Sequence, residues 1–358
     1  MPPDLPETIE QLDPTHVRWR GKRHVYFGGC DYLRLAWHAG IRRAVRDGVD
    51  RHGLNVSASR MTTGNHPIYG ATETRLAEFF KARSVALVSS GYLSNLVVAQ
   101  AYQGRAETVL IDESAHPSLR DAGCLMGAKL VSFGHLDTGD LRLKIAKAKG
   151  RVMVMTDAVF GHDGSLAPLR DYHAALPEKG ILLADDSHGV GVLGDHGRGS
   201  LEHWGIAYRR VIQTATFSKA FGVYGGVILG GPGLRKRLAS GSGAFIGNTP
   251  LPPHLVSGIA AAIGVMGRSQ ARRQRLLRNL RTVTAGIGVG QKNFPVISVV
   301  PANEAERRRI VRNLSAAGIH PPFIRYPGGV ANGFFRFAIS SEHTRGQLEA
   351  LIGALQGL

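Results

Sequence analysis

One lysine stands where the neighbouring side chains would keep water away from its amine. Lys219 lies in TATFSKAFGVYGG, residues 214–226, with a phenylalanine two residues away on either side and a glycine pair close behind. Desolvation disfavours a charged amine, so these surroundings predict a lowered pKa for Lys219 and a nucleophile that can form a Schiff base. A lysine that reaches solvent from a helix would have the same local sequence, so both interpretations stay open at this point.

A second candidate is SSGYLSN, residues 89–95, which follows an apolar run and precedes a helical pattern. The free N–H groups at such a helix start, together with the helix dipole, would hold a phosphate group. The contacts would come from Ser90, Gly91 and Tyr92. Many turns between a strand and a helix look alike, so this signal is weak by itself.

A third candidate is LLADDSHGVGVLG, residues 182–194, where two carboxylates follow an apolar run. A buried acid is costly unless it is paired, so we expect Asp185 to point inward at a cationic ligand atom, with His188 forming a hydrogen bond nearby. The alternative is a solvated turn in which an aspartate caps a helix. A metal site is not expected, because further ligands at suitable spacing are lacking.

Together these three features describe more than each does alone. A phosphate-binding turn, a buried aspartate and an activated lysine, in this order, are what pyridoxal phosphate requires. The aspartate would keep the pyridine nitrogen protonated, so that the ring can absorb electrons from a carbanion. The lysine would bind the aldehyde and later move the α-proton of the substrate.

The elements that must position these residues form an α/β pattern. Continuous apolar runs alternate with helical patterns, and such runs predict a buried, mostly parallel sheet. The runs lie at residues 84–89, 108–112, 152–157, 180–186, 211–216 and 225–231. Open sheets of this kind bind ligands at the carboxyl ends of their strands, where the three candidate motifs lie.

The chain changes character near residue 250, at the proline-rich stretch NTPLPPH. A long basic amphipathic helix follows, and then a β-α-β-α pattern typical of a small α+β domain. The predicted organisation is an N-terminal segment 1–45, a large cofactor-binding α/β domain 46–253, a linking helix 254–283 and a small C-terminal α+β domain 284–358.

The joint pattern resembles the α-oxoamine synthases, which are pyridoxal-phosphate enzymes of fold type I. The matching stretches include DYLRLAWH (31–38), SASRMTTGNHPIYGATETRLAEFF (57–80), DESAHPSLRDAG (112–123), DDSHGVGVLGDHGRG (185–199), TFSKAFGVYGG (216–226) and FRFAISSEHT (335–344). They follow the family's order over almost the whole chain. The joint match is therefore specific, although no single motif is.

The resemblance implies roles for the residues around the cofactor ring. Lys219 would bind the aldehyde, and Asp185 would pair with the pyridine nitrogen. His188 would form a hydrogen bond with the ring hydroxyl, and His116 would stack on the ring. The chain departs from the family's pattern at Gly161, where a serine hydroxyl usually sits near the cofactor.

Further roles concern the phosphate and the substrate. The residues expected at the phosphate are Ser90, Gly91, Tyr92, either Thr216 or Ser218, and Thr249 from a neighbouring subunit. Arg336 would bind the substrate carboxylate, although a surface position on a strand is the alternative. Because the family's active sites lie at a subunit interface, a homodimer is expected.

The resemblance also implies the reaction, a decarboxylative condensation of an amino acid with an acyl thioester to an α-amino ketone. L-Alanine and a pimeloyl thioester, as used in biotin synthesis, are the most expected substrates. Relatives that use glycine or serine are the alternatives within the family. A pyridoxal-phosphate aminotransferase or aldolase, and a basic binding protein without catalysis, are the alternatives outside it.

The composition bounds the partners. The formal net charge is +17, and the basic residues are scattered, with denser patches at 271–281 and 306–313. No zinc-finger, RRM or KH signature is present, so no nucleic-acid partner is expected. An arginine-rich surface without a role, or attraction of a phosphate-bearing thioester or an acidic acyl carrier protein, would account for the charge.

The compartment is predicted from what the sequence lacks. The two cysteines show no CxxC spacing, and neither a signal peptide nor an apolar run of about 20 residues is seen. We therefore expect a reduced, cytoplasmic setting and no membrane span.

Overall fold

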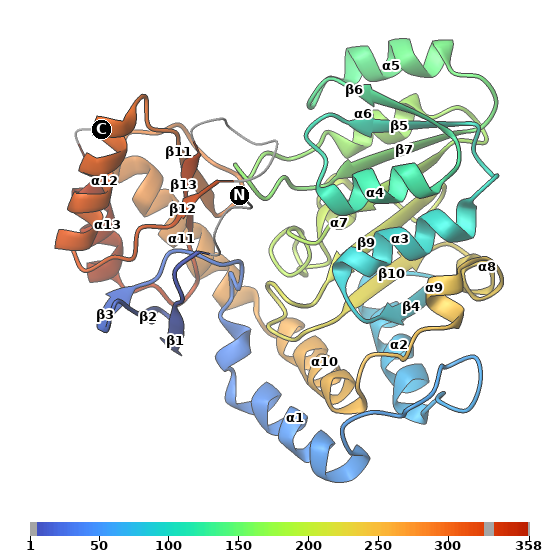
Figure 1. The fold of residues 1–358 in the computed structure, drawn as a ribbon, viewed down its shortest axis with the longest axis horizontal. Helices are drawn as coiled ribbons and strands as arrows, with labels where there is room; N and C mark the ends of the chain where they lie inside the picture. Colours follow the sequence, from blue (N-terminus) through green and yellow to red (C-terminus); the bar gives the residue numbers. More distant parts are fainter. Residues whose placement is uncertain (1–5, 326–332, 357–358) are drawn as a thin grey trace. The chain divides into compact units, whose positions relative to one another are not determined.

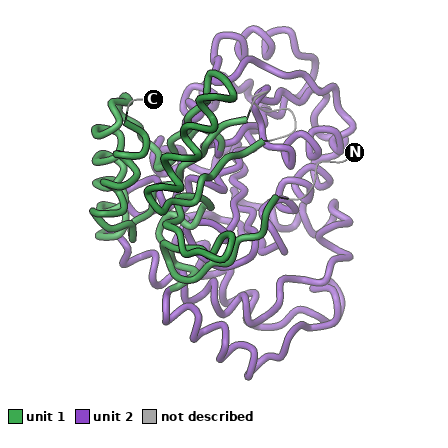
Figure 2. The backbone as a smooth tube through the Cα atoms, turned by 60° about the vertical axis from the view of Figure 1, so that its left-hand side comes forward, with its two compact units in different colours: residues 1–37, 162–164, 271–358 green, residues 38–161, 165–270 purple. Residues whose placement is uncertain are grey.

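The structure is a computed structural model that describes residues 6–325 and 333–356. The chain forms two compact units, coloured separately in Figure 2. Unit 1 comprises residues 1–37, 162–164 and 271–358, and unit 2 comprises residues 38–161 and 165–270. These limits differ from the boundaries predicted from sequence, because the N-terminal residues cluster with the C-terminal ones.

Unit 2 is built on a seven-stranded sheet (Figure 1). In spatial order its strands are β4 (Ser84–Val88), β10 (Gly226–Gly230), β9 (Val211–Thr216), β8 (Ile181–Asp185), β7 (Val152–Asp157), β5 (Thr108–Asp112) and β6 (Lys129–Phe133). Strand β10 is antiparallel to both of its neighbours, and the other pairs are parallel. The predicted α/β fold with a mostly parallel sheet is confirmed.

Helices cover both faces of this sheet, because alternate side chains of each strand point to opposite faces. Ile111, Met155 and Leu183 belong to one apolar cluster, and Leu110 and Leu182 belong to another. The first cluster includes side chains of α3 (Gly91–Tyr102), α4 (Pro117–Leu125), α8 (Leu234–Gly241) and α9 (Gly243–Ile246). The second includes side chains of α5 (Thr138–Lys147), α6 (Leu169–Ala175) and α7 (Ser200–Trp204).

Strand β6 was not expected from the sequence. Four of its five residues are exposed or half-buried, since it is the edge strand of the sheet. The apolar runs that revealed the other strands reflect burial on both faces. An edge strand lacks that burial, so its sequence carries a weaker signal.

Three further helices of unit 2 are α1 (Ala39–His52), α2 (Pro67–Phe80) and α10 (Pro253–Met266), and α10 packs against both of the others. A buried carboxylate ties α2 to the sheet. Glu73 pairs with Arg60 at 2.6 Å and with Arg235, and it accepts the backbone N–H of Leu87 at 3.0 Å. These contacts fix the position of β4, which leads into the candidate phosphate-binding turn.

In place of one basic helix over 254–283, the structure has α10 and α11 (Gln270–Gly286). Residues 267–269 separate them. Gly267 has low helix propensity, and the hydroxyl of Ser269 donates to the carbonyl of Val265 at 2.7 Å. The break coincides with a division between the units, because α10 belongs to unit 2 and α11 to unit 1.

Unit 1 holds two antiparallel sheets. The first consists of β1 (Glu10–Asp13), β2 (His16–Trp19) and β3 (Lys22–Val25), and the second of β11 (Val296–Val299), β13 (Phe334–Ala338) and β12 (Phe323–Ile324). Its helices are η1 (Leu35–Trp37), α11, α12 (Glu304–Ala316) and α13 (Arg345–Leu355). The C-terminal part follows the expected β-α-β-α order except for one additional short strand, β12, whereas the N-terminal sheet was not predicted.

Within residues 6–325 and 333–356, no helix is long and apolar enough to cross a bilayer. Cys30 and Cys124 are both free thiols.

Candidate active site

Three aspartates end neighbouring strands at one edge of the sheet of unit 2. Asp112, Asp157 and Asp185 are the last residues of β5, β7 and β8, and all three side chains are buried. Asp157 and Asp185 are directly paired in the register of β7 and β8. The sequence motifs therefore meet at the edge where α/β sheets bind ligands.

The Asp185 carboxylate is held by two donors. The side-chain amide of Asn95 donates to Oδ2 at 2.6 Å, and the backbone N–H of Ser187 donates to Oδ1 at 2.9 Å. Thr214 in turn donates its hydroxyl to Oδ1 of Asn95 at 2.6 Å, which fixes the orientation of the amide. The result is a buried acceptor group in a rigid setting, as a cationic ligand atom would require.

The same asparagine reaches His116 through one serine. Asn95 Nδ2 donates to Ser118 Oγ at 2.9 Å, and Ser118 Oγ lies 2.8 Å from Nδ1 of His116. The backbone N–H of Ser118 also points at that Nδ1, at 3.2 Å. Since Nδ1 accepts from the backbone, it carries no proton, so the serine hydroxyl donates to it as well. The neutral ring of His116 then carries its proton on Nε2.

Electrostatics keep this imidazole neutral. Loss of hydration lowers the pKa of His116, and the nearby Lys219 acts in the same direction while Asp185 opposes it. His116 is an exposed residue, and its ring stands edge to face against Tyr92 at 6.1 Å. His116 thus presents a neutral ring of fixed tautomer at the sheet edge.

Asp157 was not singled out from the sequence, although VMVMTD ends in an aspartate just as ILLAD does. Its Oδ2 accepts the backbone N–H of His116 at 2.7 Å. Burial raises the pKa of Asp157 well above its usual range, the charge of Asp185 adds to this, and Lys219 opposes it. The charge of Lys219 therefore lowers the pKa of both His116 and Asp157, and both groups also feel the charge of Asp185. We infer that the Lys219 amine lies close to these three side chains.

Lys219 follows β9 in a tight turn. The phenylalanines on either side, Phe217 and Phe221, are fully buried, while the lysine itself is half-buried. The glycine pair has a steric reason. Gly225 has φ +143°, and a Cβ at Gly226 would lie 2.2 Å from the carbonyl oxygen of Ser90. The turn that carries Lys219 thus packs directly on the turn that starts α3.

That second turn is the candidate phosphate site. The side-chain hydroxyl of Ser90 caps α3 by accepting the N–H of Leu93 at 3.2 Å, and the backbone carbonyl of Ser90 accepts the N–H of Ser94 at 3.1 Å. The N–H groups of Gly91 and Tyr92 precede any possible intrahelical bond. A Cβ at Gly91 would lie 2.7 Å from Cβ of Thr216, so only glycine fits this approach.

The sequence left Thr216 and Ser218 as alternatives for the hydroxyl at the phosphate, and their hydrogen bonds in the structure differ. Thr216 donates its hydroxyl to the carbonyl of Gly225 at 3.0 Å and accepts the N–H of Ser218 at 3.1 Å. Ser218 is exposed, and among the described residues its own hydroxyl has no assigned partner. Ser218 is therefore the hydroxyl with a hydrogen still to donate.

Asp186, the residue after Asp185, makes its hydrogen bonds with other residues than Asp185 does. The two neighbouring carboxylates therefore have different roles. Asp186 accepts from the N–H and the hydroxyl of Ser200 and from the side chain of Gln213, each at 2.6 Å. Asp186 thus holds the start of α7 through Ser200, but it is fully buried and is not the N-cap residue, which is Gly199, so the alternative of a solvated capping aspartate does not describe it.

Asp186 leads to a prediction about stability and pH. Burial raises the pKa of Asp186 to about 7, although hydrogen bonds from Ser200 oppose the shift. The folded pKa lies above the unfolded one, so this group's contribution is full below pH 4 and is lost as the pH rises to 7. We expect Asp186→Asn to gain up to about 4 kcal/mol over the wild type across this range. Urea unfolding at pH 4, 5.5 and 7 checks this, and parallel profiles for the two proteins would contradict it.

His188 explains the departure at Gly161. A Cβ at Gly161 would lie 2.3 Å from Nε2 of His188, so the imidazole occupies the space beside the glycine. A serine at this position would displace the ring. The absence of a serine hydroxyl at residue 161 is therefore explained by the position of the His188 ring, which leaves no room for a side chain there.

Two other predicted residues lie elsewhere in the chain. Arg336, on β13 of unit 1, is buried, so the surface alternative is wrong. It donates to the carbonyl of Gly29 at 3.1 Å and to the hydroxyl of Tyr32 at 3.2 Å. Thr249 is exposed in unit 2, and its neighbour Asn248 donates to the hydroxyl of Ser89 at 3.1 Å.

Comparison with known proteins adds independent findings. Residues 30–355 match the family model described as aminotransferase class I and II. The 8-amino-7-oxononanoate synthase of Methylococcus capsulatus is 35% identical, over 97% of this chain and 92% of its own length. The 8-amino-7-oxononanoate synthase of Thioalkalivibrio sulfidiphilus is 33% identical, over 94% and 88%.

Solved structures agree with these relatives. A serine palmitoyltransferase of Sphingomonas wittichii superposes with a TM-score of 0.90 at 24% identity, over 97% of this chain and 90% of that one, which shows the fold. An 8-amino-7-oxononanoate synthase of Francisella tularensis superposes with a TM-score of 0.80 at 25% identity, over 92% and 97%. The chain belongs to the pyridoxal-phosphate-dependent aminotransferase class I and II family, within its α-oxoamine synthase branch.

Proposed function

We propose that the chain condenses L-alanine with a pimeloyl thioester, giving 8-amino-7-oxononanoate, carbon dioxide and a free thiol. The supporting observation is the grouping of Lys219, Asp185 and His116 at one edge of the sheet. The chain that carries this group is similar over nearly its full length to proteins named 8-amino-7-oxononanoate synthase.

The residues at this edge fit pyridoxal phosphate. Gly91, which has no side chain, lets Thr216 pack closely against the start of α3, whose first N–H groups suit a phosphate. Ser218 adds a hydroxyl donor. Asp185 offers a buried carboxylate to a protonated pyridine nitrogen, and Lys219 offers an amine to the aldehyde. These donors and acceptors match the cofactor's charged and polar groups.

When bound, pyridoxal phosphate supplies an electron sink for the pair left behind when the α-proton of the amino acid is removed. Lys219 Nζ would take that proton and would return one to the same carbon after carbon dioxide has left. Asp185 would hold positive charge at the pyridine nitrogen throughout. His116, fixed at Nδ1 by Ser118, would keep its ring face and its Nε2–H in one orientation.

The remaining roles rest on the match with the family. We propose that His188 contacts the ring hydroxyl, that Arg336 binds the substrate carboxylate and that Thr249 reaches the phosphate of a second subunit. The last role implies a homodimer. The Arg336 guanidinium is buried in unit 1, where it donates to the carbonyl of Gly29.

The acyl donor is either a coenzyme A or an acyl carrier protein thioester. We propose that exposed arginines of α11, among them Arg278 and Arg281, attract the acidic carrier. Other arginines of the basic patches are held locally: Arg272 and Arg275 pair with Glu342, and α12 pairs its own acids. The two free cysteines support a reduced, cytoplasmic location.

The function is tested with purified protein, pyridoxal phosphate and pimeloyl-coenzyme A, to which L-alanine, L-serine or glycine is added separately. We expect carbon dioxide and 8-amino-7-oxononanoate with L-alanine at the lowest amino acid concentration. A preference for L-serine or glycine would assign another reaction of the same family. Transamination with a keto acid, without carbon dioxide release, would assign an aminotransferase instead.

Ser118 gives a test of how His116 is held. Ser118→Ala removes a donor to the unprotonated Nδ1, so the pKa of His116 should rise and the acid limb of the kcat/KM profile should move to higher pH. We expect kcat/KM at neutral pH to fall about tenfold, as for one lost hydrogen bond. Ser114→Ala, whose hydroxyl lies outside this network, is the control. An unchanged pH profile in Ser118→Ala would contradict the assignment.

A further inference from the structure

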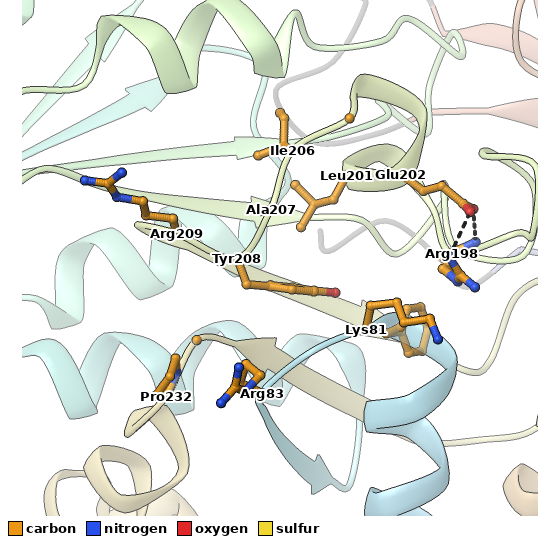
Figure 3. Close-up of a pocket in the computed structure, with 13 residues that line it drawn as sticks. Lys81, Arg83, Arg198, Leu201, Glu202, Ile206, Ala207, Tyr208, Arg209 and Pro232 are labelled. Carbon is orange, nitrogen blue, oxygen red and sulfur yellow. Dashed lines mark hydrogen bonds and ion pairs between the residues drawn. The ribbon is translucent and has the colours of Figure 1, made fainter.

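A cavity of unit 2 lies at the end of the sheet opposite to the candidate active site. Its volume is about 520 Å³, within the range of small-molecule sites. Residues 80–83 before β4, α7 with the loop that follows it, and residues 231–232 after β10 line the cavity (Figure 3). The loop leads into β9 at Val211, whereas the lysine turn follows the other end of β9 at Thr216. The length of that strand, roughly 17 Å, separates the two places.

The lining is strongly basic. Lys81, Arg83, Arg198 and Arg209 contribute four cations, and Glu202 is the one carboxylate among the lining residues. Three positive charges are therefore left without a counter-charge in the cavity wall. Lys81, Arg83 and Arg209 are exposed, and within the described part of the chain none of them forms an ion pair with a carboxylate.

The single acid is already occupied. Glu202 pairs with Arg198 at 3.3 Å and with the ring of His196 at 2.6 Å, and it accepts the backbone N–H groups of both residues at 3.1 Å. Although burial opposes the shift, these hydrogen bonds lower the pKa of Glu202. The carboxylate is thus ionised and has little capacity left to neutralise the other cations.

One donor in the wall lacks a partner. Nε of Arg198 is buried, and among the described residues it has no hydrogen-bond acceptor. A buried donor without a partner costs free energy, and a bound anion would remove that cost. This separates the cavity from a solvated arginine-rich surface, where water satisfies every guanidinium.

The rest of the lining is apolar and aromatic. Leu201, Ile206 and Pro232 form walls, and Tyr208 extends across the middle of the cavity in Figure 3. The Tyr208 hydroxyl donates to the side chain of Gln213 at 2.5 Å, which holds the ring in place. A fixed aromatic ring suits a planar body, and the basic rim suits several negative charges.

We propose that this cavity binds an organic phosphate of about mononucleotide size, with the phosphates on Lys81 and Arg83 and the planar body against Tyr208. Three uncompensated charges favour a multiply charged phosphate over a single carboxylate. The shared chemistry is a phosphate ester on a flat base, which both a free nucleotide and the nucleotide part of coenzyme A carry. The site is distinct from the candidate active site and does not depend on the proposed reaction.

The test is calorimetric titration of the cofactor-loaded protein with ADP, coenzyme A and inorganic pyrophosphate at 150 mM salt. We expect saturable binding of ADP or coenzyme A, and weaker binding of pyrophosphate, which lacks the planar body. Tighter binding of ADP would point to a free nucleotide, and tighter binding of coenzyme A to the thioester carrier. If pyrophosphate binds as tightly as ADP and coenzyme A do, the proposed contact between a planar base and Tyr208 is wrong.

Charge reversal locates the binding. Lys81→Glu with Arg83→Glu should weaken it about 100-fold, as for two charge-assisted contacts. Arg142→Glu, on the exposed face of α5, changes charge without touching the cavity and should leave the affinity within about threefold. All variants should keep the cofactor's visible spectrum and the basal activity. No saturable binding of ADP or coenzyme A at millimolar concentration, or an equal loss in Arg142→Glu, would overturn the proposal.

Discussion

Lys219→Ala is expected to abolish turnover, with kcat/KM lowered by about 10⁴-fold or more. The amine would have two roles: it would bind the cofactor's aldehyde, and it would transfer the α-proton. Each role contributes a large factor to the rate enhancement. The variant should also lose covalent attachment of pyridoxal phosphate. Borohydride reduction followed by peptide mass measurement checks this directly, because the wild type should carry the adduct on the peptide that contains Lys219.

The matched control is Lys236→Ala. Lys236 is an exposed lysine on α8 of the same unit, and among the described residues it has no ion-pair partner. Its replacement should leave both the adduct and the rate unchanged. An adduct that persists in Lys219→Ala, or that appears on another lysine of the wild type, would remove Lys219 from its proposed role.

Geometry explains why Lys219 is the lysine for this role. Lys219 lies just after the end of β9, and its charge affects the pKa values of His116 and Asp157. Asp157 ends β7 and His116 follows β5, so all three residues lie at the same edge of the sheet. The packing of Gly226 against Ser90 keeps the lysine turn on the turn that starts α3. Larger residues at the glycine pair would separate the amine from the phosphate-binding turn.

Much of this arrangement could be predicted from the sequence, for a physical reason. Strands buried on both faces are continuous apolar runs, and parallel strands end at the same edge, so Asp185 and Lys219 had to lie near each other. The half-exposed strand β6 and the N-terminal sheet carry no such runs, and they were missed. The break between α10 and α11 was missed because basic and apolar residues keep a helical pattern across it.

The residues that hold the site could not be predicted in the same way. Asn95 and Ser118 matter because α3 and α4 pack on the same face of the sheet, which places one amide between Asp185 and the serine beside His116. Asp157 matters because β7 lies next to β8. Strand order and helix packing are properties of the fold, and the local sequence around these residues does not contain them.

Asp185→Asn is expected to lower kcat/KM by about 10²- to 10⁴-fold, with cofactor still bound through Lys219. A neutral amide cannot stabilise positive charge on the pyridine nitrogen, so the electron sink weakens where it is most needed. Asp186→Asn is the matched control, since it makes the same change in the next residue but faces Ser200 and Gln213. We expect it to keep activity within about threefold.

A double variant separates charge from hydrogen bonding. In Asp185→Asn the new amide meets the amide of Asn95, so part of the loss could come from two donors facing each other. Asp185→Asn with Asn95→Asp restores a donor and an acceptor between residues 185 and 95 but moves the charge to α3, and residue 95 then no longer donates to Ser118. If the charge at residue 185 carries the effect, the double variant stays as slow as Asp185→Asn, and the cofactor's visible spectrum differs from that of the wild type. Recovery of the wild-type rate would mean that Asp185 only holds Asn95 in place, and the pairing with the cofactor ring would then have to be assigned to another group.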